Sequence, residues 1–187
     1  MRFYLMPLYR LGAWLAGLSM LAIVTLITAQ VLSRALDRLL VAVGHAPLGW
    51  TISGVSEIAG FLLVGATFLG SAYTFATRGH IRVTLVTERL PLRIRVLLEV
   101  VALTLALVLT GYLGIELWVL LEDSIAYDEV SYGLAAIPLV YPQAVLVSGI
   151  ALLALAITET LLNTVVLGVI DPHRLDAPLP EQDSVVD

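Results

Sequence analysis

The sequence has no cysteine, no lysine and few charges of any kind. Without cysteine the chain can form no disulfide, offer no thiolate to a metal and use no thiol nucleophile. The absence of cysteine also gives no indication of whether its compartment is oxidising or reducing. Only 13% of its 187 residues are charged, whereas 59% are hydrophobic and the mean hydropathy is +0.97. This composition excludes an ordinary water-soluble domain and indicates an integral membrane protein.

Sequence patterns that carry enzyme chemistry are also missing. The three histidines, His45, His80 and His173, fall in expected loops or in the terminal tail, so no pair is placed within a helical bundle to ligate haem. The chain has no HExxH pattern for a metal and no glycine-rich phosphate loop. Its pI near 5.1 argues against nucleic acid as a partner. We therefore expect no catalytic residue, no metal and no cofactor.

Four hydrophobic runs are each long enough to cross a bilayer, which takes about 20 apolar residues. They cover residues 11–31, 52–77, 96–121 and 138–166. We predict an all-α integral membrane protein, with one four-helix transmembrane domain over residues 1–170. Residues 171–187 are acidic and contain proline, so we expect a disordered cytoplasmic tail there. The alternative, that the first run is a cleaved signal peptide, is less favoured because its apolar part exceeds the usual length of about 7 to 15 residues.

Arginine sets the predicted orientation. Five arginines follow the second run: Arg78, Arg82, Arg89, Arg93 and Arg95. The segment between the third and fourth runs has four acidic residues and no arginine. Because short arginine-rich loops stay in the cytoplasm, we predict that both termini lie inside. We expect Trp14, Trp50 and Trp118, which fall near helix ends, at the lipid–water interface.

Residues 32–43, between the first two runs, repeat leucine and valine at helical spacing. Polar residues, among them Arg34 and Asp37, occupy the other face. This pattern fits a separate amphipathic helix at the outer membrane interface. It fits equally an extension of the first helix beyond the membrane. Both interpretations stay open at this point.

The second predicted helix carries small residues on one stripe. The stripe consists of Ser56, Gly60, Thr67, Gly70, Ser71 and Thr74. Small residues let helix backbones approach closely, which is the main source of specific packing between helices in lipid. We therefore expect this helix to pack against protein along its length. Gly111 and Gly114 suggest the same, more weakly, for the third helix; the alternative is that small residues are simply common in membrane helices.

The acidic residues within the hydrophobic runs lie toward the predicted helix ends. They are Glu57, Glu99, Glu116 and Glu159. An intramembrane carboxylate is costly and commonly functional, but none of these falls clearly at the midplane. The chain also shows no internal repeat and no matching pair of broken helices, which mark secondary transporters. We do not expect it to transport a solute alone.

The segment SEIAGFLLVGATFLGSAYTFATRGHIRVTLV, residues 56–86, resembles the signature of the small membrane subunit of tripartite ATP-independent periplasmic (TRAP) transporters, the DctQ-like family. The matching residues are Glu57, Phe68-Leu69-Gly70, Arg78-Gly79-His80-Ile81 and Val83. The stretch IPLVYPQAVLVSG is similar to the start of the family's fourth helix, through Pro138, Tyr141 and Pro142. One departure is Thr84, where family members often carry an acidic residue.

The resemblance implies one subunit of a three-part secondary transporter in the bacterial inner membrane. A substrate-binding protein on the outer side captures a small organic anion, usually a carboxylate. The large membrane subunit moves it across with sodium, and the small subunit enlarges and anchors the static scaffold of the large one. The alternative function is a stand-alone four-helix assembly factor or membrane-embedded enzyme.

We expect the small-residue stripe and Glu57 to contact the large subunit and the arginines to contact lipid headgroups. We further hypothesise that Gly79-His80 makes a sharp helix exit that docks on the large subunit. The alternative is a loop histidine at the level of the headgroups.

Overall fold

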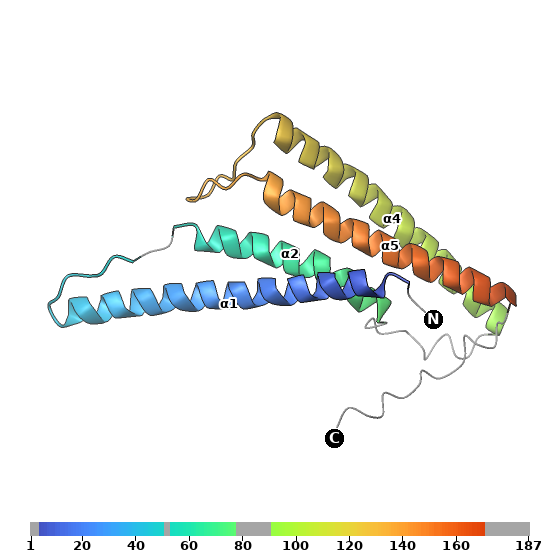
Figure 1. Ribbon diagram of the computed structural model, residues 1–187, viewed down its shortest axis with the longest axis horizontal. Helices are drawn as coiled ribbons and strands as arrows, with labels where there is room; N and C mark the ends of the chain where they lie inside the picture. The colour runs from blue at the N-terminus through green and yellow to red at the C-terminus, as the bar shows by residue number, and fades with distance from the viewer. Residues whose placement is uncertain (1–3, 51–52, 78–90, 171–187) are drawn as a thin grey trace, which may run out of the picture.

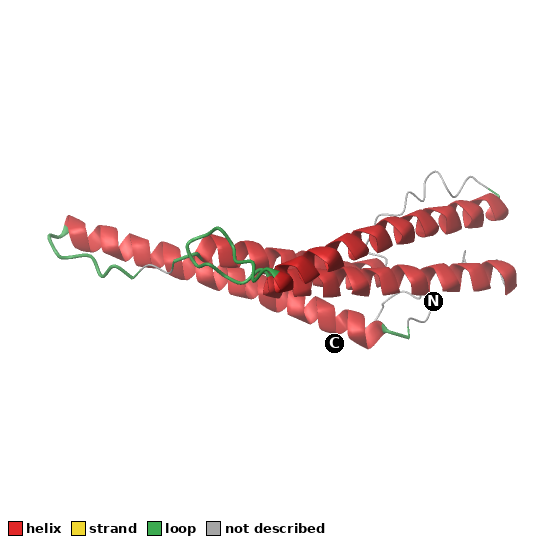
Figure 2. Cartoon of the chain, turned by 90° about the horizontal axis from the view of Figure 1, so that it is seen from above, coloured by secondary structure: helices red, strands yellow, loops and turns green. Residues whose placement is uncertain are grey.

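The computed structural model describes residues 4–50, 53–77 and 91–170 (Figure 1). These residues form α1 (Met6–Ala42), α2 (Val55–Ala76), α4 (Leu92–Ala126) and α5 (Val140–Ile170). Each of the four is long and apolar enough to cross a membrane. Within the described ranges Figure 2 shows only helices and connecting loops. The predicted all-α membrane fold with four spanning helices is thus confirmed.

The helices pack in the order α1, α2, α5, α4, so α1 and α4 are the outermost. Each bundle end is named here by the helix termini that lie toward it. The closed end is marked by Met6, Ala76, Leu92 and Ile170, and the open end by Ala42, Val55, Ala126 and Val140. In Figure 1 the α1–α2 pair and the α4–α5 pair diverge toward the open end.

The first helix is continuous through Ala42, which decides between the two interpretations of residues 32–43. They extend α1 and do not form a separate interfacial helix. With 37 residues, α1 is about 55 Å long, which exceeds a hydrocarbon core of about 30 Å. The polar residues of this extension include Asp37, whose Oδ1 accepts the amides of Leu48 (2.8 Å) and Gly49 (3.3 Å). The chain therefore turns back along the end of α1.

The other helix limits follow from local backbone chemistry. α2 begins after Gly54, whose φ of +77° suits glycine. α4 begins after Pro91, four residues before the predicted start, and continues five residues past the predicted end. α5 has Pro142 in its first turn, where no amide hydrogen is needed.

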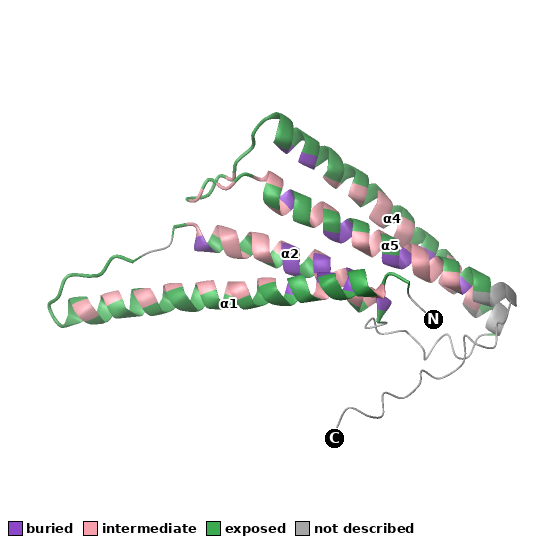
Figure 3. Cartoon of the chain, in the orientation of Figure 1, coloured by how far each residue is buried: buried purple, intermediate pink, exposed green. Residues whose placement is uncertain are grey.

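The core is small and lies mostly where α1, α2 and α5 meet, with Leu103 and Leu121 of α4 also buried (Figure 3). At the closed end Tyr9, Ala72, Ala76 and Ala156 are buried together. In contrast, α1 and α4 expose many large apolar side chains, such as Leu21 (63%) and Val108 (61%). Surfaces of this kind suit lipid or another protein rather than water.

Candidate functional site

Two glycines bring three helices together at one point of α2. A Cβ at Gly12 of α1 would lie 2.7 Å from the carbonyl oxygen of Leu69. A Cβ at Gly149 of α5 would lie 2.7 Å from the carbonyl carbon of Phe68 and 3.0 Å from the amide nitrogen of Leu69. Both contacts are tighter than a side chain permits, so α1 and α5 approach the α2 backbone because these residues are glycine. We call this arrangement the glycine contact.

The sequence did not single out Gly12 or Gly149. The sequence instead pointed to the Phe68-Leu69-Gly70 triplet of α2, and this triplet lies at the glycine contact. Gly70 packs on α1, where its added Cβ would lie 3.3 Å from the Cβ of Ala16. Of the two glycines noted on α4, Gly114 packs similarly on Ile150 of α5, whereas Gly111 meets nothing within 4 Å.

The predicted small-residue stripe of α2 is mostly left uncovered by the described part of the chain. Ser56, Gly60, Thr67 and Thr74 are exposed, and Gly70 and Ser71 are partly buried. Packing within the chain uses other residues of α2, namely Val55, Gly65, Ala66, Leu69, Ala72 and Ala76. We call the exposed residues Ser56, Gly60, Leu63, Thr67 and Thr74 the outward face of α2. The expectation that the stripe packs on protein thus depends on a partner.

Glu57 connects the start of α2 to the α4–α5 loop. Its Oε2 accepts the amide of Ala135 at 3.3 Å, and its carboxylate packs so closely on Gly133 that a Cβ there would collide with it. The position in the first helical turn suits a carboxylate, because free amide hydrogens and the helix dipole favour negative charge there. The other oxygen, Oε1, is buried and has no hydrogen-bond partner among the described residues.

Glu159 connects α5 to the start of α1 at the closed end. Its Oε2 accepts the hydroxyl of the wholly buried Tyr9 at 2.9 Å, and its Oε1 accepts the amide of Tyr4. Two helices distant in sequence are thus joined through one carboxylate. Sequence reasoning noted the acid but not its partners, since neither tyrosine has a spacing relation to it.

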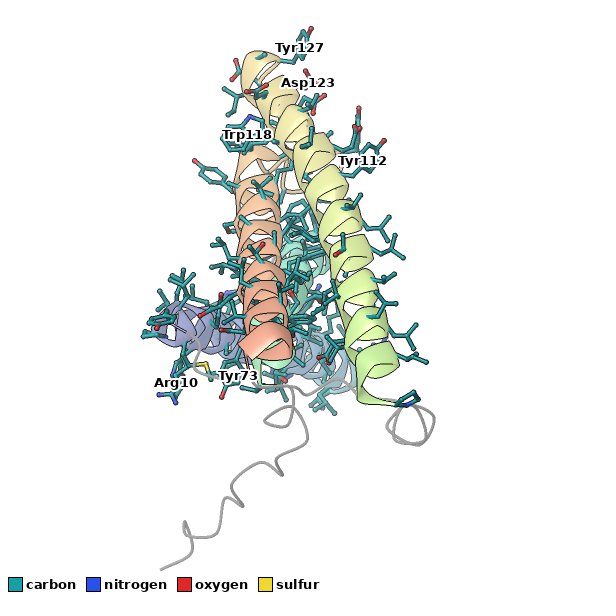
Figure 4. All side chains as sticks on the ribbon, turned by 90° about the vertical axis from the view of Figure 1, so that its right-hand side faces the viewer. Arg10, Tyr73, Tyr112, Trp118, Asp123 and Tyr127 are labelled. Atoms are coloured by element: carbon teal, nitrogen blue, oxygen red, sulfur yellow. The ribbon has the colours of Figure 1, made fainter. Side chains whose placement is uncertain are left out.

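The carboxylates of α4 include Glu116 and Glu122. Glu116 lies one turn after Tyr112, which projects away from the other helices (Figure 4). Glu122 accepts the indole Nε1–H of Trp118 at 2.8 Å. Glu99 lies in the second turn of α4.

A polar pocket and an apolar groove lie between α1 and the rest of the bundle. The pocket, about 410 Å³, is at the open end and is lined by Gln30, Arg34, residues 53–57, Gly133 and Leu134. The groove, about 590 Å³, lies deeper and is lined by residues of α1 (Leu15, Leu18, Ser19, Ala22), α2 (Ile58, Phe61, Leu62, Leu69) and α5 with its approach (Ile137, Tyr141, Pro142, Val145).

Several predicted residues fall outside the described ranges or have side chains that are not described. Arg78, Gly79, His80, Arg82 and Arg89 lie outside them, so the docking hypothesis for Gly79-His80 stays a prediction. Arg93 and Arg95 lie in the first turn of α4.

The three tryptophans are all exposed: Trp14 75%, Trp50 78% and Trp118 53%. Their depth in the membrane stays a prediction. Among the described residues no group of three acidic or histidine side chains could hold a metal ion.

Comparison with known families gives one match. The family model for the DctQ component of tripartite ATP-independent periplasmic transporters matches residues 23–167, well over half of the chain. The matched stretch covers all of α2 and α4 and most of α1 and α5, including Glu57, Gly149 and Glu159. No curated protein matches the chain.

Proposed function

Because the chain belongs to the DctQ component family of tripartite ATP-independent periplasmic transporters, we propose that this small permease subunit anchors the large membrane subunit and enlarges its static scaffold. The complex takes up small organic anions, in the main carboxylates, together with sodium. A substrate-binding protein delivers the anion on the outer side of a bacterial inner membrane. Both termini of the small subunit, and its arginine-rich segment 78–95, lie in the cytoplasm.

The observation that carries the scaffold role is how six hydroxyls along the spans are bonded. The hydroxyls of Thr25, Thr67 and Thr104 each donate to the carbonyl oxygen four residues earlier in their own helix, at 2.7 to 2.8 Å. Ser19, Thr158 and Thr160 do the same. Groups bonded in this way are not arranged around a shared cavity. This supports a subunit that supplies packing surface and leaves the solute and its cation to a partner.

The outward face of α2 is the proposed contact with the large subunit. Its small side chains allow a helix of the partner to approach the α2 backbone, and the space above Gly60 is open, since a Cβ there meets nothing within 4 Å. α2 is a central helix of the row, so a partner on this face contacts the part of the chain that α1 and α5 hold in place. The apolar flanks of α1 and α4 are then left to lipid.

The test is co-purification of the small and large subunits after Gly60 is replaced by leucine. A leucine fills the outward face without touching the rest of the chain, so we expect roughly tenfold less complex and a matching loss of sodium-driven uptake in liposomes that hold all three components. The control is Gly111→Leu on α4, which also meets open space.

Equal complex yield from both variants would show that α2 is not the contact. A small subunit that is a stable monomer alone and ignores the large subunit would contradict the scaffold role itself. It would favour a stand-alone membrane protein instead.

A further inference from the structure

The pocket at the open end carries one charge of each sign. Gln30 and Arg34 lie one turn apart on α1, and Glu57 lies across from them in the first turn of α2. Among the described residues no ion pair joins Arg34 to Glu57, because the pocket of about 410 Å³ lies between these elements. The pocket is therefore suited to a group that has both charges itself.

The Glu57 carboxylate indicates the charge of the group that the pocket would bind. Its Oε2 has the amide of Ala135, but its Oε1 is buried with no donor among the described residues. Because Glu57 also lines the pocket, a cationic N–H group there is the expected complement of its carboxylate. No described lysine or arginine supplies it, and the chain contains no lysine at all.

The apolar groove continues from this pocket. Along α2 the pocket lining ends at Glu57 and the groove lining begins at Ile58, and the α5 side continues from Leu134 to Ile137. The groove ends at Leu69, where the glycine contact closes the space between the helices. From Ile58 to Leu69 is about 16 Å at the helical rise. That is close to half of a hydrocarbon core of about 30 Å, which is the depth of one leaflet.

We propose that the pocket and the groove together bind one phospholipid with an amine headgroup, of the phosphatidylethanolamine class. Its ammonium pairs with the Glu57 carboxylate, its phosphate meets the Arg34 guanidinium, and an acyl chain fills the groove between α1, α2 and α5. In the proposed orientation this is a lipid of the outer leaflet. The site goes beyond the scaffold role and does not depend on it.

Two features favour a lipid over a helix of the large subunit. A partner helix that crosses the membrane needs a path through both leaflets, whereas the groove stops at the glycine contact. In addition, all charged groups of the site lie at its open end, and the groove lining is apolar apart from the hydroxyls of Ser19 and Tyr141. This matches a molecule with a zwitterionic head and an apolar tail. An anionic lipid without an amine would leave the Glu57 carboxylate without a cation.

The experiment is native mass spectrometry of the full chain, purified with its large subunit, in detergent with added dioleoyl-phosphatidylethanolamine or dioleoyl-phosphatidylglycerol. We expect wild type to retain the ethanolamine lipid roughly tenfold better, as one charge-assisted hydrogen bond implies. Glu57→Gln should remove that preference, and Arg34→Gln should weaken retention of both lipids. Ala22→Phe, which narrows the groove, should reduce both as well.

Matched controls lie on the same helix. Arg38→Gln and Ala29→Phe change exposed residues of α1 outside the pocket and the groove, and should leave retention unchanged. Soluble glycerophosphoethanolamine, which has the head without the chains, should not compete. If it competes as well as the lipid, the groove is not part of the site and the proposal fails.

Two further outcomes would overturn the proposal. One is equal retention of the two lipids by wild type, a result that does not depend on whether any variant folds. The other is a photo-crosslinker at Leu18 that captures the large subunit, and not lipid, in native membranes. Capture of lipid at Leu18 but not at the lipid-facing control position Leu21 would support the groove as the binding site.

Discussion

The two ends of the bundle are held together in different ways. At the closed end α1, α2 and α5 pack directly, with Tyr9, Ala72 and Ala156 wholly buried. At the open end the same helices diverge (Figure 1), and the α4–α5 loop reaches the start of α2 through Glu57 and through Gly54, where an added Cβ would lie 2.5 Å from the Cβ of Ala135. One end is thus fixed by packing between helices, and the other by a loop that contacts the start of α2 and by a polar tether beside a pocket.

The two ends differ because lipid changes which side chains stabilise the packing of helices. Because lipid tails are as apolar as leucine, large apolar side chains gain little by leaving lipid for a neighbouring helix. Close approach through small residues is what holds helices together. Gly12 and Gly149 supply it near the middle of the bundle, and the alanines of α2 supply it toward the closed end. The open end lacks such residues at the helix crossings, so its spacing is set by loops, charges and whatever occupies the groove.

The largest loss of stability is expected when a side chain blocks the glycine contact. Gly149→Val places two methyl groups against the backbone of Phe68 and Leu69, which cannot move aside without separating α5 from α2. We expect a loss of about 3 kcal/mol in the free energy of unfolding. Thermal unfolding of the purified subunit complex in detergent measures it. Gly12→Val should act in the same direction, since it also meets the Leu69 carbonyl.

Gly17→Val on α1 is the control for this prediction. It introduces the same side chain into a helix but meets nothing within 4 Å, so only the small cost of a β-branched residue in a helix remains. Comparable destabilisation by Gly17→Val and Gly149→Val would mean that the glycine contact does not hold α5 on α2.

A second, smaller effect is expected from the hydrogen bonds at the closed end. Tyr9→Phe removes the donor of Glu159 Oε2 and leaves a carboxylate oxygen in an apolar surrounding, at a cost of about 2 kcal/mol. Hydrogen exchange at residues 4–9 should quicken along with the loss of stability. Tyr73→Phe is the control, because Tyr73 packs on the same cluster and donates no described hydrogen bond to Glu159. If the two variants behave alike, the Tyr9–Glu159 bond does not fix the start of α1.

Sequence reasoning found the parts of this architecture that depend on composition. Four apolar runs predicted four helices, because length and hydropathy decide which segments cross a bilayer. It did not decide the structure of residues 32–43, because a separate interfacial helix and an extension of α1 have the same amphipathic pattern. It also missed Gly12 and Gly149 among 14 glycines, because which glycine meets a neighbouring backbone depends on how the helices cross.

The candidate site was predictable only in part for the same reason. The small-residue stripe was visible at helical spacing, but the residues that pack within the chain are Ala66, Leu69 and Ala72, on another side of α2. Glu57 was visible as an acid near a helix end. Its tie to Ala135, 78 residues away, and the pocket beside it required the tertiary arrangement.

At the open end Glu57→Ala should have a smaller effect on stability. It removes one hydrogen bond of 3.3 Å but also a buried carboxylate oxygen that has no described donor, so the net loss is about 1 kcal/mol or less. The local effect is larger than the global one, because the α4–α5 loop loses its described side-chain tie to α2. Hydrogen exchange should quicken across residues 130–139 while residues 4–9 stay unchanged. Glu122→Ala, which loses only its bond to Trp118, is the control; equal exchange in both variants would contradict the tether.

The smallest effect is expected at the tip of α1, beyond the pocket. Asp37→Ala removes the acceptor for the amides of Leu48 and Gly49, but all of these groups are near water, which replaces the lost bonds. We expect a cost of about 0.5 kcal/mol, confined to the segment that turns back along α1. Limited proteolysis within residues 44–50 should then be roughly twice as fast, with no change in unfolding temperature. Arg38→Ala on the next position should leave the cleavage rate unchanged. A fall in unfolding temperature as large as that of Tyr9→Phe would show that the open end shares the tight coupling of the closed end, and the distinction between the two would be lost.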